Sequence, residues 1–284
     1  MRIDSHQHYW RAERGDYHWM SPAVPVLYRD YLPGDLRPSL LRHRIDKTIV
    51  VQAAQTVAET DFLLELAATN DSIAGVVGWL DMEAPDFSET FERYRRHPKF
   101  IGLRPMLQDL PDDRWILRPQ VLDALEYVTK ADVPFEFLTY PRHLPFVFEV
   151  LRSVPRLRAV IDHISKPEIR AGRLEPWKDW ISRLAQYPNL CCKLSGMITE
   201  ADHRHWSVDG LRPYVDRVID CFGMNRIMFG SDWPVCLQAG SYDQVIGAVE
   251  EIVSSRDSGE LERKLFGDNA VEFYKLTAIA PPAR

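Results

Sequence analysis

Short apolar runs alternate with segments of helical periodicity along the whole chain of 284 residues. The apolar runs are rich in β-branched and aromatic side chains and are bounded by turn-forming residues, a pattern typical of buried strands. Eight such runs are present, at residues 2–8, 47–53, 73–80, 100–106, 133–138, 158–163, 190–194 and 226–229.

Between these runs, apolar residues recur every three or four positions, which indicates amphipathic helices. We expect such helices around residues 63–67, 121–128, 177–184, 215–219 and 245–252. Thr60 is the expected N-cap of the first, and a last helix over residues 261–276 is expected to kink near Gly267.

Strands that alternate with helices predict a parallel sheet, because parallel neighbours need crossover connections. We favour an α/β fold of the closed (β/α)8 or TIM barrel type, with a doubly wound open sheet as the alternative. No GxGxxG motif follows any predicted strand, which removes one reason to prefer a dinucleotide-binding open sheet. The length suits one barrel domain that spans residues 1–284.

The charge pattern excludes several classes of partner. The net charge is -6 and the basic residues are scattered, so no nucleic-acid partner is expected. No run approaches ~18 apolar residues and the N-terminus lacks an apolar signal region, so we expect no membrane association and a cytoplasmic location. The four cysteines form no CxxC pair and are expected to be free thiols, whereas a monomer and a homo-oligomer both remain open.

The first predicted strand ends in the sequence His6-Gln7-His8. Because side chains alternate along a strand, Asp4, His6 and His8 are expected on one face, with Asp4 placed to orient an imidazole. If that face points into a barrel, both imidazoles lie at its mouth. Barrel enzymes place their catalytic groups there, at the C-terminal ends of the strands.

Two further strands end in polar groups of the same kind. His163 ends the sixth predicted strand, and Asp232 follows the eighth after two small residues. Together with His6 and His8, these residues can hold a divalent metal through neutral imidazoles and a carboxylate. They can also act without a metal, with the carboxylate as a base and the imidazoles polarising a carbonyl group.

Four motifs in this order resemble the amidohydrolase superfamily. They are IDSHQH (3–8), DHISKP (162–167), KLSG followed by TEAD (193–202) and FGSDWPVC (229–236). The most similar branch is that of the amidohydrolase-related proteins, which includes sugar lactonases of the L-fuconolactone hydrolase type. The resemblance runs from Ile3 to about Tyr274. It implies a distorted (β/α)8 barrel that hydrolyses carbon–oxygen or carbon–nitrogen bonds in small molecules.

The resemblance also implies roles for the four polar residues. Asp232 would take a proton from the attacking water, while His6, His8 and His163 would bind a metal or hold the lactone carbonyl. Family members with two metals use a bridging lysine or glutamate on strand four and a histidine on strand five. This chain has Arg104 on strand four and a Phe-Glu-Phe run on strand five. One Zn²⁺ or other divalent metal, or no required metal, fits this pattern better than two.

Other side chains near the strand ends are candidates for contacting a small-molecule substrate. Arg104 offers a planar fork for a carboxylate or a pair of hydroxyl groups, and tryptophan rings can stack on a sugar ring. Loops 9–36 and 167–176 follow strands and are expected to wall the site. The candidate substrate-binding residues are Arg104, Gln52, Trp10, Trp79, Lys193 and Trp233.

The favoured function is therefore hydrolysis of a small cyclic ester, a sugar (aldono) lactone, by water activated at Asp232. A decarboxylase or hydratase of a carboxylated ring-cleavage metabolite is the alternative, and it predicts that Arg104, Arg142 and Lys193 cluster in the pocket. A non-catalytic binding barrel predicts instead that the histidines and Asp232 do not converge. No GxSxG or P-loop motif is present.

Overall fold

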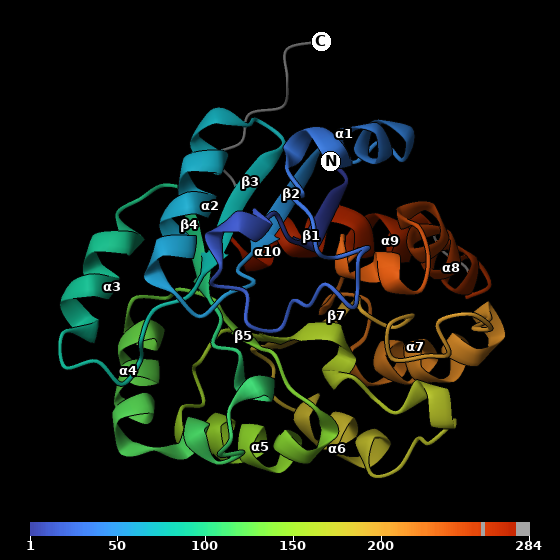
Figure 1. The fold of residues 1–284 in the computed structure, drawn as a ribbon. Coiled ribbons are helices and arrows are strands. Elements are labelled where there is room, and N and C mark those ends of the chain that lie inside the picture. Colours follow the sequence, from blue (N-terminus) through green and yellow to red (C-terminus); the bar gives the residue numbers. More distant parts are fainter. Residues whose placement is uncertain (257–258, 277–284) are drawn as a thin grey trace.

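Eight parallel strands, each paired with its neighbour in sequence, form the centre of the computed structural model, which describes residues 1–256 and 259–276 (Figure 1). Each observed strand lies inside its predicted range, because buried apolar runs mark the strands and the flanking polar residues do not extend them. The strands are β1 (Ile3–Gln7), β2 (Lys47–Val51), β3 (Ile73–Gly78), β4 (Phe100–Leu103), β5 (Phe135–Phe137), β6 (Ala159–Ile161), β7 (Leu190–Leu194) and β8 (Ile227–Phe229).

The sheet closes on itself between β1 and the turn that follows β8. The backbone N–H of Asp232 donates to the His6 carbonyl at 2.8 Å, and the N–H of His8 donates to the Trp233 carbonyl at 2.7 Å. The predicted closed barrel is thus confirmed over the open sheet. It is distorted as expected, because β4 and β5 pair at a single position.

Helices surround the strands on the outside of the barrel (Figure 1). Three of them, α1, α3 and α5, were not identified from the sequence pattern. The helices are α1 (Pro33–Arg42), α2 (Val57–Thr69), α3 (Phe87–Arg95), α4 (Pro119–Lys130), α5 (Leu144–Ser153), α6 (Trp177–Leu184), α7 (Val208–Phe222), α8 (Tyr242–Ser254), α9 (Gly259–Arg263) and α10 (Asn269–Phe273).

Two helical details differ from or refine the predictions. The N-cap of α2 is Thr56, whose side chain accepts a hydrogen bond from the backbone of Glu59, so the prediction of Thr60 was wrong. The hydroxyl of Thr60 donates instead to the carbonyl of Trp79 in the loop after β3. The last helical segment is interrupted by the π-helical turn Lys264–Asp268, which confirms a break near the predicted glycine.

A second apolar cluster lies apart from the main core that the outer helices cover. Ile49, Val51 and Met228 of the strands pack there against Phe273 and Tyr274 at the end of α10. This packing fills one end of the barrel. Within the residues that the structure describes, no helix has both the length and the apolar character needed to cross a bilayer.

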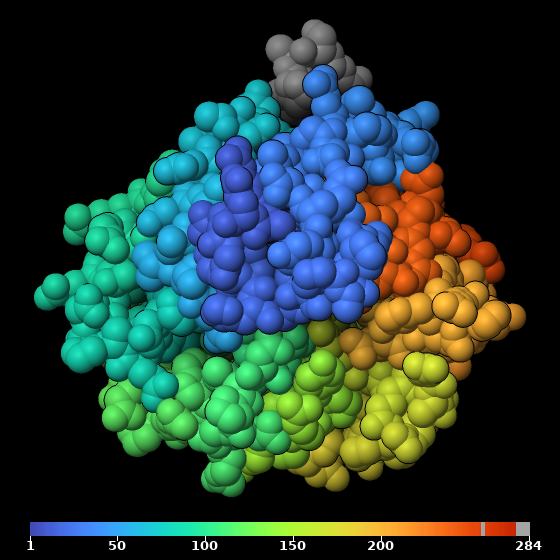
Figure 2. All heavy atoms as spheres, in the orientation of Figure 1, coloured from blue at the N-terminus to red at the C-terminus, as the bar shows by residue number. Residues whose placement is uncertain are grey.

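The segment 9–36 folds back over the open end of the barrel. The backbone groups of Trp10 and Tyr31 hydrogen-bond each other in both directions, at 2.9 and 3.0 Å. The indole N–H of Trp19 donates to the carbonyl of Ala53 at 2.6 Å. Figure 2 shows this blue part of the chain lying over the middle of the face. The segment therefore provides a wall of the site, as its position after the first strand predicts.

Candidate active site

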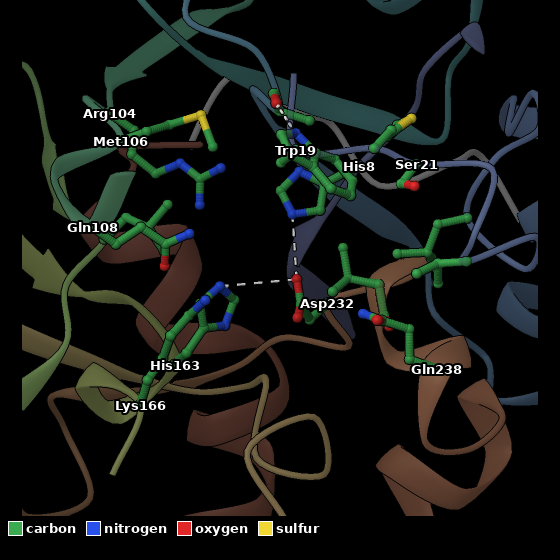
Figure 3. Close-up of a pocket in the computed structure, with 16 residues that line it drawn as sticks. His8, Trp19, Ser21, Arg104, Met106, Gln108, His163, Lys166, Asp232 and Gln238 are labelled. Atoms are coloured by element: carbon green, nitrogen blue, oxygen red, sulfur yellow. Dashed lines mark hydrogen bonds and ion pairs between the residues drawn. The ribbon is translucent and has the colours of Figure 1, made fainter. Parts of the chain in front are cut away.

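A cavity of about 200 Å³ opens at the C-terminal ends of the strands. Its lining includes the apolar side chains of Met20, Val24, Leu27, Met106, Leu138 and Val235. It also carries the polar side chains of His8, Arg104, Gln108, His163, Lys166 and Asp232, and Met106 lies beside Arg104 and Gln108 (Figure 3). This mixed lining suits a small ligand with both polar and apolar surface.

Three imidazoles converge on one oxygen of Asp232. Its Oδ1 atom lies 3.2 Å from Nε2 of His8, 3.8 Å from Nε2 of His163 and 3.9 Å from Nε2 of His6. Two of these contacts are drawn in Figure 3. The structure therefore brings together all four side chains that the sequence singled out, from β1 and the segments that follow β6 and β8. This convergence is the opposite of what a non-catalytic binding barrel predicts.

Left-handed backbone aims two of these side chains at the cavity. Asp232 has φ of 56° and His163 has φ of 52°, a conformation that costs an L-residue roughly 1–2 kcal/mol. Close packing around the turns accommodates it. A Cβ on Gly230 would lie 2.5 Å from Cβ of His6, so only glycine lets the end of β8 approach β1 this closely.

Asp4 does not orient an imidazole, contrary to the prediction. Its carboxylate accepts hydrogen bonds from the backbone of Ser231 at 2.9 Å and of His6 at 3.2 Å, and Tyr242 of α8 donates to it at 3.2 Å. The pairing register of β1 shifts between Asp4 and Gln7, and this irregularity breaks the alternation that the prediction assumed. Burial raises the pKa of Asp4 to about 6. Asp4 thus joins β1 to the turn after β8.

The hydrogen bond of His8 fixes its tautomer. Nδ1 of His8 lies 2.7 Å from the carbonyl oxygen of Val51, which can only accept, so Nδ1 carries a proton. In the neutral ring Nε2 then offers a lone pair to the Asp232 carboxylate, 3.2 Å away. Two acceptors at this distance repel each other unless a cation lies between them. The contact therefore fits either a bound metal ion or a proton shared by the pair.

The surrounding donor set also suits a divalent metal. Donor atoms of His6, His8 and Asp232 all lie within 4.8 Å of one another, and His6 forms a second such group with Asp162 and His163. Burial lowers the pKa of both His6 and His163 well below the ordinary histidine value, so both rings are neutral and offer lone pairs. Neutral imidazoles with a carboxylate are ligands that zinc prefers.

Arg104 lies at the cavity wall and is held from behind. Its guanidinium donates to the carboxylate of Asp162 at 3.1 Å and to the backbone carbonyl of Gln52. Gln52 in turn donates to the Arg104 carbonyl at 2.8 Å and does not line the cavity. Nε of Arg104 is buried without a partner among the described residues. One N–H of this fixed cation is therefore unpaired among the described residues.

Lys193 lies below the cavity in a buried ion-pair network and does not line it. Its Nζ is 2.7 Å from the carboxylate of Glu136 and 3.2 Å from that of Asp162, and all three side chains are fully buried. Tyr274 also donates to Glu136. Burial raises the pKa of Glu136 to about 7, against the opposing effect of Lys193. For Asp162 the same burial is outweighed by Lys193 and His6, and its pKa falls well below the usual value.

The structure places the three predicted stacking tryptophans outside the cavity lining. Trp10 is fully buried and packs edge-on against Trp19, with ring centroids 5.3 Å apart. Trp233 packs edge-on against Tyr9 and Tyr31, and Trp79 is half-buried in the loop after β3. Trp19 itself lines the cavity, although no sequence pattern separates it from its neighbours in the loop.

Other cavity residues also escaped the sequence analysis. Ser21, Gln108 and Gln238 line the cavity from segments outside the strands. Only Ser21 lies in a segment that was expected to wall the site. The second such segment, residues 167–176, contributes no residue to the lining. Side chains on irregular loops follow no period, so their direction could not be derived from spacing.

A (β/α)8 barrel with imidazoles and a carboxylate gathered at its C-terminal mouth defines a barrel hydrolase. The amidohydrolase family model matches residues 3–276, and the chain belongs to this family. The resemblance seen in the four sequence motifs is thereby confirmed.

Two curated relatives are similar over nearly their whole length. The L-fucono-1,5-lactonase of Burkholderia ambifaria is 41% identical over 278 residues, which covers 97% of this chain and 96% of the relative. The L-fucono-1,5-lactonase of Burkholderia multivorans is 38% identical over 286 residues, with the same shares. A crystal structure of a B. multivorans amidohydrolase with bound zinc superposes with a TM-score of 0.93 at 37% identity, and covers 97% of this chain and 99% of that one.

Proposed function

We propose that the protein is a lactonase that opens a sugar lactone of the L-fucono type with a water molecule activated at Asp232. The observation that carries the proposal is the convergence of three imidazoles on one Asp232 oxygen in a cavity that Arg104 also lines. The names of the two curated relatives support the same substrate class.

The proposed reaction needs one proton acceptor and a site for negative charge. Asp232 accepts a proton from water as the water oxygen bonds to the lactone carbonyl carbon. The oxyanion that forms is stabilised by hydrogen bonds from Arg104 and His163, both of which line the cavity. The bond from this carbon to the ring oxygen then breaks, and Asp232 returns its proton to that oxygen. The product is a hydroxy acid, which releases a proton at neutral pH.

A single divalent metal, zinc by preference, would be held by His6, His8 and Asp232. When bound, such an ion supplies Lewis-acid polarisation and lowers the pKa of a coordinated water. The residues of this chain supply the other contributions. Arg104 faces the negative charge that develops on the carbonyl oxygen, and the apolar side chains of the lining exclude bulk water.

The mixed lining of the cavity also fits a deoxy-sugar lactone. The hydroxyl groups of such a ring would face Gln108, Lys166 and Gln238, and its methyl group would face Met20 and Leu138. Oε1 of Gln108 has no hydrogen-bond partner among the described residues, and we propose that a substrate hydroxyl donates to it.

Decarboxylation is less well supported by the structure. It predicts a cluster of cations around a polycarboxylate, but Arg142 pairs with Asp113 at 3.0 Å outside the cavity and Lys193 lies beneath it. Arg104 alone of the three lines the cavity. Because two of the three cations that this alternative needs lie outside the lining, the structure supports it less well than it supports the lactone.

The proposal is tested with a panel of aldonolactones that includes L-fucono-1,5-lactone, followed by a pH indicator in weak buffer. Each substrate is assayed with the protein as purified, with added zinc and with a chelator. We expect acid release above the spontaneous rate for L-fucono-type lactones. If no lactone is opened faster than background under any of these conditions, the proposed function is wrong.

A further inference from the structure

The hydroxyl group of Ser195 lies behind the imidazole of His163, on the side away from the cavity. Ser195 follows β7 directly, and its side chain is fully buried. Its Oγ atom is 2.9 Å from Nδ1 of His163 and 3.3 Å from the backbone nitrogen of the same residue. One hydroxyl group therefore contacts both the ring and the main chain of His163.

Counting the hydrogens gives the direction of both bonds. The backbone N–H of His163 can only donate, so Oγ of Ser195 accepts that bond. Among the described residues, the hydroxyl proton has no acceptor other than Nδ1 of His163. If Nδ1 carried a proton instead, Oγ would accept twice and its own buried O–H would stay unpaired, at a cost of roughly 1–3 kcal/mol.

We propose that Ser195 is a positioning residue that fixes His163 in the tautomer with its proton on Nε2. His163 then presents an N–H to the cavity, where Nε2 lies 3.8 Å from Asp232 (Figure 3). Val51 holds a proton on Nδ1 of His8, so the neutral ring of His8 presents a lone pair at Nε2. The two histidines thus face the same carboxylate with opposite hydrogen-bonding character.

Packing keeps the ring of His163 in this orientation. Gly196 has φ of 61°, and a Cβ built on it would lie 2.6 Å from Nδ1 of His163. The backbone of Gly196 thus lies against the ring, and a ring flip that exchanges Nδ1 for a carbon atom would lose the bond to Ser195. The hydroxyl group and the glycine together leave one orientation and one tautomer.

The consequence for chemistry rests on the proposed function. A ring with its proton on Nε2 can donate to the oxyanion of an opening lactone, and the same proton prevents Nε2 from binding a metal. The ion, where bound, is then left to His6, His8 and Asp232. Ser195 touches neither substrate nor metal, and its effect is exerted through His163.

The tautomer can be observed directly by long-range ¹H–¹⁵N correlation spectra of the histidine side chains. The spectra are recorded on the full-length protein as purified and after treatment with a chelator, and His163→Gln assigns the His163 signals. We expect the proton on Nε2 in the wild type, and a shift toward the other tautomer or a mixture in Ser195→Ala. Ser195→Thr, which keeps the hydroxyl group, should restore the wild-type pattern.

Kinetics provide a second readout. Ser195→Ala should lower kcat about 10- to 100-fold on a lactone while KM changes little, because the group that is lost assists the transition state. Ser5→Ala is the matched control. Ser5 is also fully buried, but its hydroxyl group donates to the carbonyl of Phe229 at 2.6 Å. This variant should lose stability without any change in the His163 tautomer.

Two results would overturn the proposal: a wild-type spectrum with the proton on Nδ1 of His163, or a Ser195→Ala protein whose tautomer equals that of the wild type. The first needs no variant and so does not depend on whether a substitution folds. If no lactone is hydrolysed, the spectra still decide the role of Ser195, which separates failure of this inference from failure of the proposed function.

Discussion

Nε2 of His8 and Oδ1 of Asp232 lie 3.2 Å apart, and the carbonyl of Val51 holds a ring proton of His8 on the far side of the ring, at Nδ1. In the neutral ring both facing atoms accept hydrogen bonds, so the contact becomes favourable when a metal ion or a shared proton lies between them. The position lies at the mouth of the barrel, with His6 at 3.9 Å from the same oxygen. The contact between Nε2 of His8 and Oδ1 of Asp232 is therefore also the candidate metal centre of the site.

Substitution of His8 should weaken zinc binding. We expect the wild-type protein to bind about one equivalent of zinc and His8→Gln to bind at least ~10-fold more weakly, because one imidazole ligand is lost. Isothermal titration calorimetry measures both. His143→Gln is a control, since His143 is buried against Asp113 outside the cavity. Equal zinc affinities for the two variants would remove His8 from the metal site.

Lys193 should matter for folding rather than for substrate affinity. Lys193→Met leaves the carboxylates of Glu136 and Asp162 buried without their shared cation, which should destabilise the fold by about 3–5 kcal/mol. Denaturant unfolding measures this loss. A variant of wild-type stability with a raised KM would instead support the predicted contact with substrate.

The stability of the protein should fall as pH rises from about 4.5 toward 8 because of Glu59. Burial raises the pKa of this carboxyl from 4.5 to about 8, although the backbone of Ala53 and Ala54 donates to it. The folded state thus holds the proton over a range where the unfolded chain releases it, so the contribution is full below pH 4.5 and is lost toward pH 8.

The variant Glu59→Gln removes this titration. We expect its unfolding free energy to vary less across the same pH range than that of the wild type, as measured by urea denaturation at several pH values. Parallel pH dependences for the two proteins would show that another group causes the loss.

Trp19 should contribute to substrate binding more than the tryptophans singled out by the sequence. Trp19→Ala removes a cavity wall and the bond to Ala53, so we expect KM to rise several-fold with a smaller change in kcat. Trp79→Ala is the comparison, because Trp79 does not line the cavity. A larger KM effect at Trp79 than at Trp19 would contradict this account of the cavity wall.

The pattern of apolar runs predicted the eight strands and the barrel, because a buried strand is determined by its own local sequence. Buried strands need continuous apolar runs, and a parallel barrel brings their C-terminal ends to one face, which is why His6, His8, His163 and Asp232 could be grouped in advance. The alternation of side chains along a strand did not predict the position of Asp4. A register shift changes the direction of this side chain, and no periodicity in the sequence indicates such a shift.

The cavity walls could not be derived in the same way. Trp10 and Trp19 stand in one loop and have the same chemistry, yet one is buried in the fold and the other lines the cavity. Likewise, Lys193 at a strand end has the position of a ligand-binding residue, and only its distances to Glu136 and Asp162 show that internal carboxylates already neutralise it. Both distinctions depend on long-range packing.

The most direct test of the account is the rate at which Asp232→Asn opens an aldonolactone that the wild type hydrolyses, measured by acid release and compared with a thermal unfolding curve. We expect a loss of at least ~100-fold in kcat with the fold intact, because the amide cannot accept the proton of water. A folded Asp232→Asn protein with a kcat near that of the wild type would contradict it.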